Sequence, residues 1–421
     1  MKSAALRLLA VSAALAGSAF AWDAVGHRTV NQLALAALPD DFPAFVKDPA
    51  AAERIAFLAN VPDRWRNVDP WLKQVGPSWT DHFLDIEQLP MAGLDPRTVS
   101  SFRYDFVVAF AAGRAAHPQN FPAFDPAKNT DHTREWPGFA PWAIAEWTQK
   151  LRSAFAYLKA FEEMGGTPEE IANAREDVIY TMGVLGHYVG DCAQPLHTTD
   201  SHNGWVGPNP NGYTTAKNLH SWIDGGIIAK TGINARDLRP RVTPATPLPP
   251  STPPDGRDPL FVAAMDYVLQ THELVEPLYQ MEKAGQLGGP AVEKDGVVVQ
   301  AERPVAPEGR AFIENRLLAG GEMLAKLWIT AWKTAPVDTY LRSQLAKRPA
   351  AAQLSPAPAP APAAVSAADY HGPYWGSSKS TKYHNPNCEY AEKISAANKV
   401  VFNSKEEAVK AGYVPCGKCK P

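Results

Sequence analysis

Residues 185–197 read LGHYVGDCAQPLH and combine histidines and an aspartate in an otherwise mostly apolar segment. His187 and Asp191 stand four positions apart, so on a helix they lie on one face. Pro195 breaks that helix, and His197 therefore lies on the segment that turns away from it. Imidazole and carboxylate groups gathered in this way bind transition metals. A single His-x3-Asp pair is more often a hydrogen-bonded surface pair, so the metal interpretation needs further residues.

A second motif supplies them. Residues 218–224 read NLHSWID and repeat the His-x3-Asp spacing with His220 and Asp224 on another predicted helix. Two such pairs that face one another across a cleft would offer nitrogen and oxygen ligands to metal ions.

The start of the chain predicts export. Lys2 and Arg7 precede a mostly apolar run at 8–16, and residues 19–21 read AFA, so residues 1–21 have the form of a secretory signal peptide. The apolar run is too short to span a bilayer. Cleavage would leave a free α-amine on Trp22, and such an amine has a pKa of roughly 7.7–8.0. That amine and its own carbonyl oxygen could chelate a metal, and we expect a periplasmic or extracellular protein.

Composition excludes several classes of protein. The 421 residues carry a formal net charge of −3, which argues against broad electrostatic binding of nucleic acid, so any recognition of phosphate must be local. Four cysteines are too few for a disulfide scaffold in an exported chain of this size. Cys192 lies in an apolar stretch and is expected to be a buried small residue. No second apolar segment reaches 18 residues, so we expect no stable membrane insertion.

Hydrophobic spacing predicts a mainly α protein. Apolar residues recur at intervals of three and four over the ranges 28–38, 104–115, 140–163, 168–189, 258–285 and 311–334. The clearest strand signal is 291–301, where Asp295-Gly296 could turn a hairpin. We therefore expect one helical domain over 22–345, an Ala/Pro-rich linker over 346–370 and a small α+β zinc-binding module over 371–421.

Over roughly residues 22–335 the chain resembles the S1/P1 nuclease family, within the wider superfamily of zinc-dependent phospholipase C and P1 nuclease. The motifs that carry the resemblance are Trp22 with the nearby His27, DRWR at 63–66, HFLD at 82–85, the His-x3-Asp-x5-His of 187–197 and NLHSWID at 218–224. The resemblance implies a helical fold of the phospholipase C/P1 nuclease type.

The resemblance also implies three zinc ions. The first would be held by Asp63, His82, His187 and Asp191. A second would be held by the amine and carbonyl of Trp22, by His27 and by Asp191 as a bridge. The third would be held by His197, His220 and Asp224.

The implied reaction is hydrolysis of single-stranded DNA or RNA, and of 3′-nucleotides, by a zinc-bridged hydroxide that leaves 5′-phosphate ends. Asp63 would ligate metal and orient the attacking water. Arg66, one helical turn later, would clamp the phosphate, although a surface salt bridge is the alternative role. Phe83 and Asp85 share one face of an extended segment and would contact the base. Core packing for Phe83 and a local cap for Asp85 are the competing roles.

The loop at 198–213 departs from the usual pattern of the nuclease branch, and its Trp205 and Tyr213 could form an aromatic wall for bases or for a choline head group. A zinc phospholipase C acting on phospholipid head groups is therefore an alternative, although Asp224 favours the nuclease branch. A non-catalytic metal-binding or adhesive protein is a second alternative, against which Asp63, Asp191 and Arg66 argue. No protein partner follows from the sequence. The remaining histidines are expected on the surface or in loops: His117, His132, His202, His272 and His371.

The end of the chain contains a different ligand set. His384, Cys388, Cys416 and Cys419 have the spacing of a structural zinc site with three cysteines and one histidine. A module this short needs such a cross-link. It resembles the small zinc-binding domain of the Ada DNA-repair protein, but His384 stands where that family has its alkyl-accepting cysteine, so alkyl transfer is not expected. A disulfide between Cys416 and Cys419 is the alternative.

Overall fold

The computed structural model describes residues 22–68, 72, 79–129, 132–290, 292–294, 297–348 and 374–421. Helix makes up 59% of it and strand 5%, in agreement with the expected mainly α class. The chain divides into two compact units, Met1–Ser355 and Pro356–Pro421. The expected signal peptide (1–21) and most of the expected linker (346–370) lie outside the described residues. In the part of the chain that is described, no helix is long and apolar enough to cross a membrane.

The first unit is built from helices joined by short 3-10 turns. Its helices are α1 (Ala24–Ala36), α2 (Pro49–Leu58), α3 (Val61–Val68), α5 (Gln88–Met91), α6 (Arg103–Ala116), α7 (Ala140–Met164), α8 (Pro168–Ala193), α9 (Leu219–Ser221), α10 (Ile227–Thr231), α11 (Ala235–Leu238), α12 (Pro259–His272), α13 (Val275–Lys283), α14 (Pro307–Lys333) and α15 (Thr339–Leu345). One expectation is wrong: the range 258–285 is not one helix, because the chain ends α12 at His272 and begins α13 at Val275.

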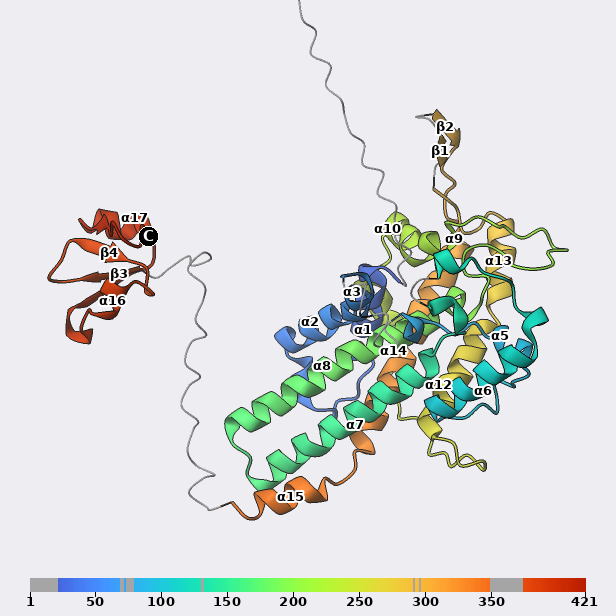
Figure 1. Ribbon diagram of the computed structural model, residues 1–421, viewed down its shortest axis with the longest axis horizontal. Helices are drawn as coiled ribbons and strands as arrows, with labels where there is room; N and C mark the ends of the chain where they lie inside the picture. The colour runs from blue at the N-terminus through green and yellow to red at the C-terminus, as the bar shows by residue number, and fades with distance from the viewer. Residues whose placement is uncertain are drawn as a thin grey trace, which may run out of the picture. The chain divides into compact units, whose positions relative to one another are not determined.

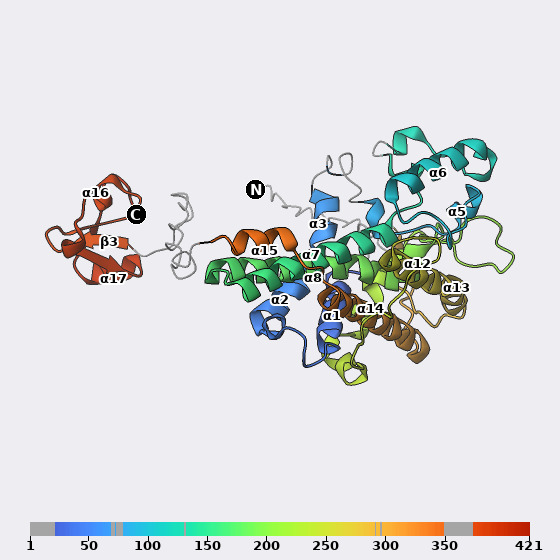
Figure 2. The same cartoon turned by 90° about the horizontal axis from the view of Figure 1, so that it is seen from below.

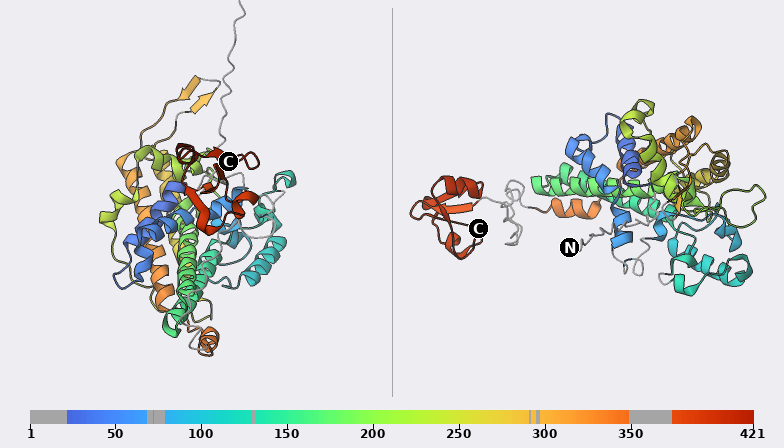
Figure 3. Two further views of the ribbon diagram at one scale, coloured as in Figure 1. Left: turned by 90° about the vertical axis from the view of Figure 1, so that its left-hand side faces the viewer. Right: turned by 90° about the horizontal axis from the view of Figure 1, so that it is seen from above.

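Two long helices, α7 and α8, pack side by side as an antiparallel pair, and α5, α6 and α13 lie beyond one end of it (Figure 1; Figures 2 and 3 show it from other sides). The sequence explains the sharp turn between them. Gly165 ends α7 in the left-handed conformation, at φ 74°, which glycine adopts without steric cost. Thr167 then caps α8: its hydroxyl accepts from the Glu170 amide, and the Glu170 carboxylate accepts from the Thr167 amide.

The C-terminal half of α8 is the centre of the unit. α1, α2, α7 and α14 all pack against this helix, and nearly every residue from Val178 to Ala193 is buried. A helix buried on all sides is usually apolar all round. Here His187 and Asp191 are both fully buried within that stretch. Burial of a polar side chain costs free energy unless it is hydrogen-bonded or paired with a charge, so the residues around His187 and Asp191 must supply such partners.

Close backbone approach fixes α1 against α8. Asn31 of α1 donates through Nδ2 to the carbonyls of Ile55 (2.8 Å) and Gly183 (3.1 Å). A Cβ at Gly186 would lie 1.8 Å from Asn31 Oδ1. Only glycine therefore fits at this position, and α1 is brought close enough for His27 to reach the end of α8.

Small sheets complete the fold. In the first unit β1 (Val292–Lys294) and β2 (Val297–Gln300) pair antiparallel, as the hairpin expectation required, and the proposed turn at 295–296 lies outside the described residues. In the second unit the strand order is β5-β3-β4-β6, with β3 (Tyr374–Ser377), β4 (Lys382–His384), β5 (Lys399–Phe402) and β6 (Val414–Pro415). Two short helices, α16 (Glu389–Glu392) and α17 (Lys405–Lys410), accompany the sheet. Its own small core is Tyr374, Tyr383, Phe402 and Ala408.

Replacing Gly186 by alanine should destabilise the first unit by about 2 kcal/mol, because the new methyl group overlaps Asn31 Oδ1. The midpoint of urea unfolding measures the loss. In an Asn31→Ala background the same substitution should cost much less, since the obstructing oxygen is absent. An equal cost in both backgrounds would contradict this packing argument.

Candidate metal centre

The first ligand group gathers around the end of α8. His187 and Asp191 lie one turn apart on that helix, and His82 ends the 3-10 turn η2 (Thr80–His82). His82 Nδ1 lies 2.8 Å from His187 Nε2 and 3.0 Å from Asp191 Oδ2, and His187 Nε2 lies 3.2 Å from the same oxygen. Asp63 on α3 brings Oδ1 to 4.0 Å from His82 Nδ1. Ligands 2.0–2.1 Å from a tetrahedral ion are about 3.3 Å apart, so these separations suit a zinc-sized ion.

The hydrogen bond behind His187 identifies its free nitrogen. His187 Nδ1 lies 2.7 Å from the carbonyl oxygen of Ala59. A carbonyl can only accept, so Nδ1 carries a proton and Nε2 is the nitrogen that faces His82 and Asp191. This backing bond from the outer nitrogen is the arrangement that orients histidine ligands in metal sites.

A second group uses the other oxygen of Asp191. His27 Nε2 lies 3.3 Å from Asp191 Oδ1, while Asp191 Oδ2 faces His82 and His187. The His27 and His187 rings stack with centroids 4.0 Å apart. Both nitrogens of the fully buried His27 lack a hydrogen-bond partner among the described residues. A buried imidazole nitrogen that has no hydrogen-bond partner and lies next to a carboxylate is suited to bind a metal ion.

The residue expected to begin the mature chain lies beside this second group. Trp22 is fully buried, and its indole Nε1 donates to the carbonyl oxygen of Gly190 at 2.7 Å, one residue before Asp191. The next amide, of Asp23, donates to the carbonyl oxygen of Asp224 at 3.3 Å. A Cβ at Gly190 would stand 3.0 Å from His27 Nδ1, so the glycine leaves room for that ring.

The third group joins His197, His220 and Asp224. His197 lies in the 3-10 turn η6 (Pro195–Thr198), His220 on α9, and Asp224 in the π-helical turn η7 (Trp222–Gly226) that continues α9. Their ligand atoms are close: His197 Nε2 is 3.0 Å from His220 Nε2, and that nitrogen is 2.9 Å from Asp224 Oδ2. His197 Nδ1 donates to the His82 carbonyl at 2.8 Å, so its Nε2 lone pair also faces the group. A π turn within a helix is rare and often marks a functional site.

The structure thus brings the metal-ligand candidates of the first unit together into three buried groups that could hold metal ions: His27 with His187 and Asp191; Asp63 with His82 and His187; His197 with His220 and Asp224.

Three residues around the groups were not predicted as part of the site. Gln194 donates through Nε2 to Asp224 Oδ1 at 2.7 Å, which leaves Oδ2 directed at His220. His272, expected on the surface or in a loop, is half-buried at the end of α12 and donates through Nδ1 to the Thr198 carbonyl. The His202 ring, also expected on the surface or in a loop, lies 5.8 Å from the His220 ring. In the sequence, Gln194 is marked only by its position directly before Pro195, where α8 ends.

Burial controls protonation here. Burial and the nearby His187 lower the pKa of His27, and burial with His220 lowers the pKa of His202 to about 4. Both rings are therefore neutral at pH 7, which is the form that binds metal. Burial would raise the pKa of Asp191, but the His187 and His197 rings hold it well below its usual range. Burial raises the pKa of Asp224 well above its usual range, against the opposing effect of His197.

The candidate substrate residues lie on the segment that follows His82. Phe83 is extended and half-buried, and Asp85 is buried. Burial, with Glu87 and Asp200 nearby, raises the pKa of Asp85 well above its usual range, so its neutral form can donate as well as accept. Gln88 Nε2 donates to Asp85 Oδ2 at 3.0 Å. Arg66 falls within α3, and its side chain lies outside the described residues.

The aromatic residues of the 198–213 loop pack on one another. The Trp205 and Tyr213 rings are 4.8 Å apart, and each contacts Tyr279 of α13. Tyr213 is buried and its hydroxyl donates to Glu276 Oε1 at 2.7 Å. Tyr213 is therefore part of the packed interior, and of the two residues expected to form an aromatic wall only Trp205 is partly exposed.

The second unit has a ligand group of its own. His384, Cys388, Cys416 and Cys419 place their ligand atoms within 4.8 Å of one another. His384 Nδ1 lies 3.6 Å from Cys388 Sγ, close to the separation of about 3.6 Å that Zn–N and Zn–S bonds impose in a tetrahedron. All four cysteines of the chain are free thiols, including the buried Cys192, whose expected burial is confirmed. The geometry fits a metal ion better than a disulfide.

No known family model and no curated protein matches this chain.

Asp191→Asn should weaken two of the three groups at once, because each oxygen of Asp191 faces a different set of histidines. We expect elemental analysis to show the loss of about two bound metal ions per chain, with the third group and the second unit still loaded. Asp258→Asn is the matched control, since that aspartate caps α12 away from the groups and asparagine caps equally well. Retention of every ion by the Asp191 variant would exclude the bridging role.

Cys416→Ser should remove one metal ion per chain without changing the metal content of the first unit. In the unaltered protein, Cys388, Cys416 and Cys419 should react with a thiol reagent only after a chelator has been added, because a metal-bound thiolate is protected. Three reactive thiols before chelation would contradict a metal site here. If Cys416 and Cys419 react with the thiol reagent only after a reductant has been added, the two residues form a disulfide instead.

Proposed function

We propose that the protein is an exported trizinc phosphodiesterase, an endonuclease that hydrolyses single-stranded DNA or RNA to products with 5′-phosphate ends and that also hydrolyses 3′-nucleotides. The observation that carries the proposal is the position of Asp191, whose two carboxylate oxygens face two different sets of ligand nitrogens 3.0–3.3 Å away. One carboxylate shared in this way is what a closely spaced pair of metal ions requires.

The residue assignments follow the resemblance to the S1/P1 nuclease family and its fold. The first ion would bind Asp63, His82, His187 and Asp191. The second would bind His27, Asp191 and the amine and carbonyl of Trp22, whose side chain is anchored at Gly190. The third would bind His197, His220 and Asp224. The three buried His/Asp groups support these assignments, with His187 belonging to both of the first two groups. The Trp22 amine would exist only after cleavage of the expected signal peptide.

Zinc ions in such a site lower the pKa of bound water and neutralise the negative charge of a phosphodiester. The residues of the chain prepare this chemistry. Asp63, a buried carboxylate at the edge of the first group, can accept the proton of the attacking water at Oδ1 and hold that water in line with the phosphorus. Arg66, one turn further along α3, is proposed to hold the non-bridging oxygens of the phosphate.

Recognition of a base is proposed for the segment after His82. Phe83 supplies a half-buried ring next to a ligand, and an unpaired base can stack on such a ring. Asp85 supplies a buried carboxyl group that hydrogen-bonds to polar edges. Stacking needs a base that is free of its partner strand, which favours single-stranded substrates.

Phospholipid head groups are the alternative substrate, favoured by the half-exposed face of Trp205, which could contact a choline group. The burial of Tyr213 leaves only part of the aromatic wall that this alternative needs. A protein that binds metal without catalysis is the alternative of another class. The module at the end of the chain is proposed to hold one further structural zinc ion.

The decisive experiment incubates the zinc-loaded mature protein with single-stranded DNA, RNA and phosphatidylcholine. We expect cleavage of both nucleic acids to products with 5′-phosphate ends. Hydrolysis of lipid alone would reject the nuclease proposal in favour of the phospholipase, and no turnover with all three groups loaded would identify a binding protein.

The matched control carries one additional residue before Trp22. It keeps every side-chain ligand but moves the terminal amine away from the second group, so it should lose most activity. Undiminished turnover would remove the amine from the ligand set while leaving the rest of the proposal in place.

A further inference from the structure

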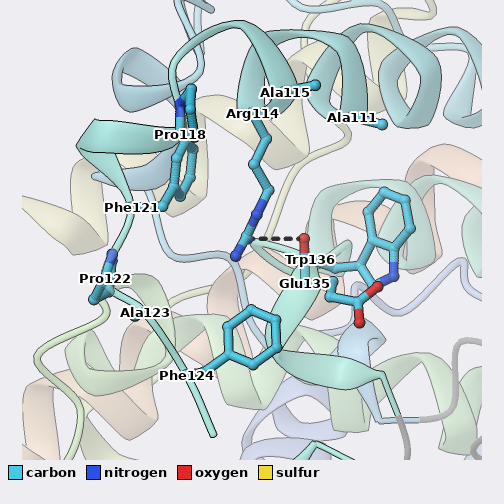
Figure 4. Close-up of a pocket in the computed structure, with 10 residues that line it drawn as sticks. All are labelled: Ala111, Arg114, Ala115, Pro118, Phe121, Pro122, Ala123, Phe124, Glu135 and Trp136. Atoms are coloured by element: carbon cyan, nitrogen blue, oxygen red, sulfur yellow. Dashed lines mark hydrogen bonds between the residues drawn. The ribbon is translucent and has the colours of Figure 1, made fainter. Parts of the chain in front are cut away.

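A cavity of about 580 Å³ opens on the surface of the first unit, outside the three ligand groups. It lies between the C-terminal half of α6 and the segments 118–124 and 135–136 (Figure 4). Its walls are aromatic and apolar, from Phe121, Phe124, Trp136 and several alanines and prolines, with Arg114 reaching in from α6. This volume lies within the ordinary range for sites that bind small molecules.

Arg114 is the polar centre of this cavity. Its guanidinium lies 4.7 Å from the centroid of the Phe121 ring and 5.5 Å from that of Phe124. Nη1 donates to the backbone carbonyl of Glu135 at 3.2 Å. This bond fixes the planar group between the rings, and most of its five N–H donors have no hydrogen-bond acceptor among the described residues.

Among the described residues that line the cavity, Glu135 is the one carboxylate, and its side chain contacts Asn129 and His132. Glu135 Oε1 accepts from Asn129 Nδ2 at 3.0 Å and lies 2.8 Å from His132 Nδ1. Its hydrogen bond from Arg114 goes to the backbone oxygen and not to the side chain. The cavity therefore presents a cation between aromatic faces, which suits a flat, electron-rich group that carries negative charge.

The cavity is joined to the candidate metal centre through one stretch of backbone. Trp136 leads into residues 137–140, which run antiparallel to the segment that carries His82. The Asp85 amide donates to the Pro137 carbonyl at 2.6 Å, and the Ala140 amide donates to the Phe83 carbonyl at 3.1 Å. Leu84 bridges Gly138, so His82 and Trp136 each lie two residues from this pair, on opposite sides of it.

We propose that this cavity is an accessory subsite, in which a nucleobase of the single-stranded substrate stacks against Arg114 and the phenylalanine rings while the guanidinium holds the adjoining phosphate. The inference rests on the proposed nuclease function and adds a site for a nucleotide away from the bond that is cleaved. Bases stack readily on aromatic rings and on arginine planes, and an arginine grips phosphate through two N–H groups.

A lipid surface is the competing occupant, because Tyr104 and Val108 of α6 are exposed by 77% and 68%. The charges on this helix argue against it. α6 carries two arginines, of which Arg103 is paired with Asp81 and Arg114 points into the cavity, so little positive charge remains to meet an anionic bilayer. A cavity with a cation inside it fits a nucleotide better than a flat membrane.

The test uses Arg114→Ala and Phe124→Ala in the full-length mature protein, with Arg97→Ala as the control for loss of one exposed positive charge. Binding of a fluorescein-labelled 12-mer oligothymidylate with hydrolysis-resistant phosphorothioate linkages is followed by anisotropy. Each variant should raise the Kd about tenfold, the effect of losing one stacked base. Arg97→Ala should bind like the unaltered protein. Two independent variants keep the test valid if one fails to fold.

Kinetics separate this inference from the proposed function. Both variants should lower kcat/KM for an unmodified 12-mer about tenfold more than for the dinucleotide TpT, which is too short to reach from the cleaved bond to the cavity. Normal cleavage by the unaltered protein with no difference between variants and control would overturn the subsite alone. Loss of binding to phosphatidylcholine vesicles in place of the oligonucleotide would assign the cavity to lipid. Failure of the unaltered protein to cleave any nucleic acid would overturn both proposals.

Discussion

The candidate centre depends on one buried carboxylate at the end of a buried helix. Asp191 is fully shielded from water, yet its oxygens lie within 3.3 Å of nitrogens from His27, His82 and His187. An isolated carboxylate in such a place would be strongly destabilising. Helices α1 and α8 and the η2 turn must therefore meet here with the correct spacing, and Gly186 and Gly190 are the positions where a side chain would prevent that approach.

The spacing of apolar residues along the sequence predicted much of the helical unit, and the spacing of histidines and aspartates predicted two local ligand pairs. His187 with Asp191 and His220 with Asp224 are local pairs, because residues four apart on a helix share one face. Their grouping with His27, Asp63 and His82 followed from the resemblance and not from local spacing. The tail ligands were also predictable, since cysteine pairs at such intervals have few other roles.

What the sequence did not predict comes from contacts between distant segments. Gln194 orients Asp224, and the carbonyls of Ala59 and His82 fix two imidazole rings, but backbone carbonyls leave no trace in the residue pattern. The break between α12 and α13 interrupts a continuous apolar pattern without a proline or glycine at Glu273 or Leu274. The cavity around Arg114 is likewise formed by loops whose positions tertiary packing decides.

The burial of Trp22 has a consequence for when the protein becomes active. Its indole is fixed to the Gly190 carbonyl, one residue before Asp191, and the side chain is fully buried. If the α-amine of this residue completes the second group, an unprocessed precursor inside the cell lacks one ligand and stays latent. Under the proposed function, removal of the expected signal peptide would then act as the switch, and the RNA of the producing cell would be spared until the protein had left the cytosol.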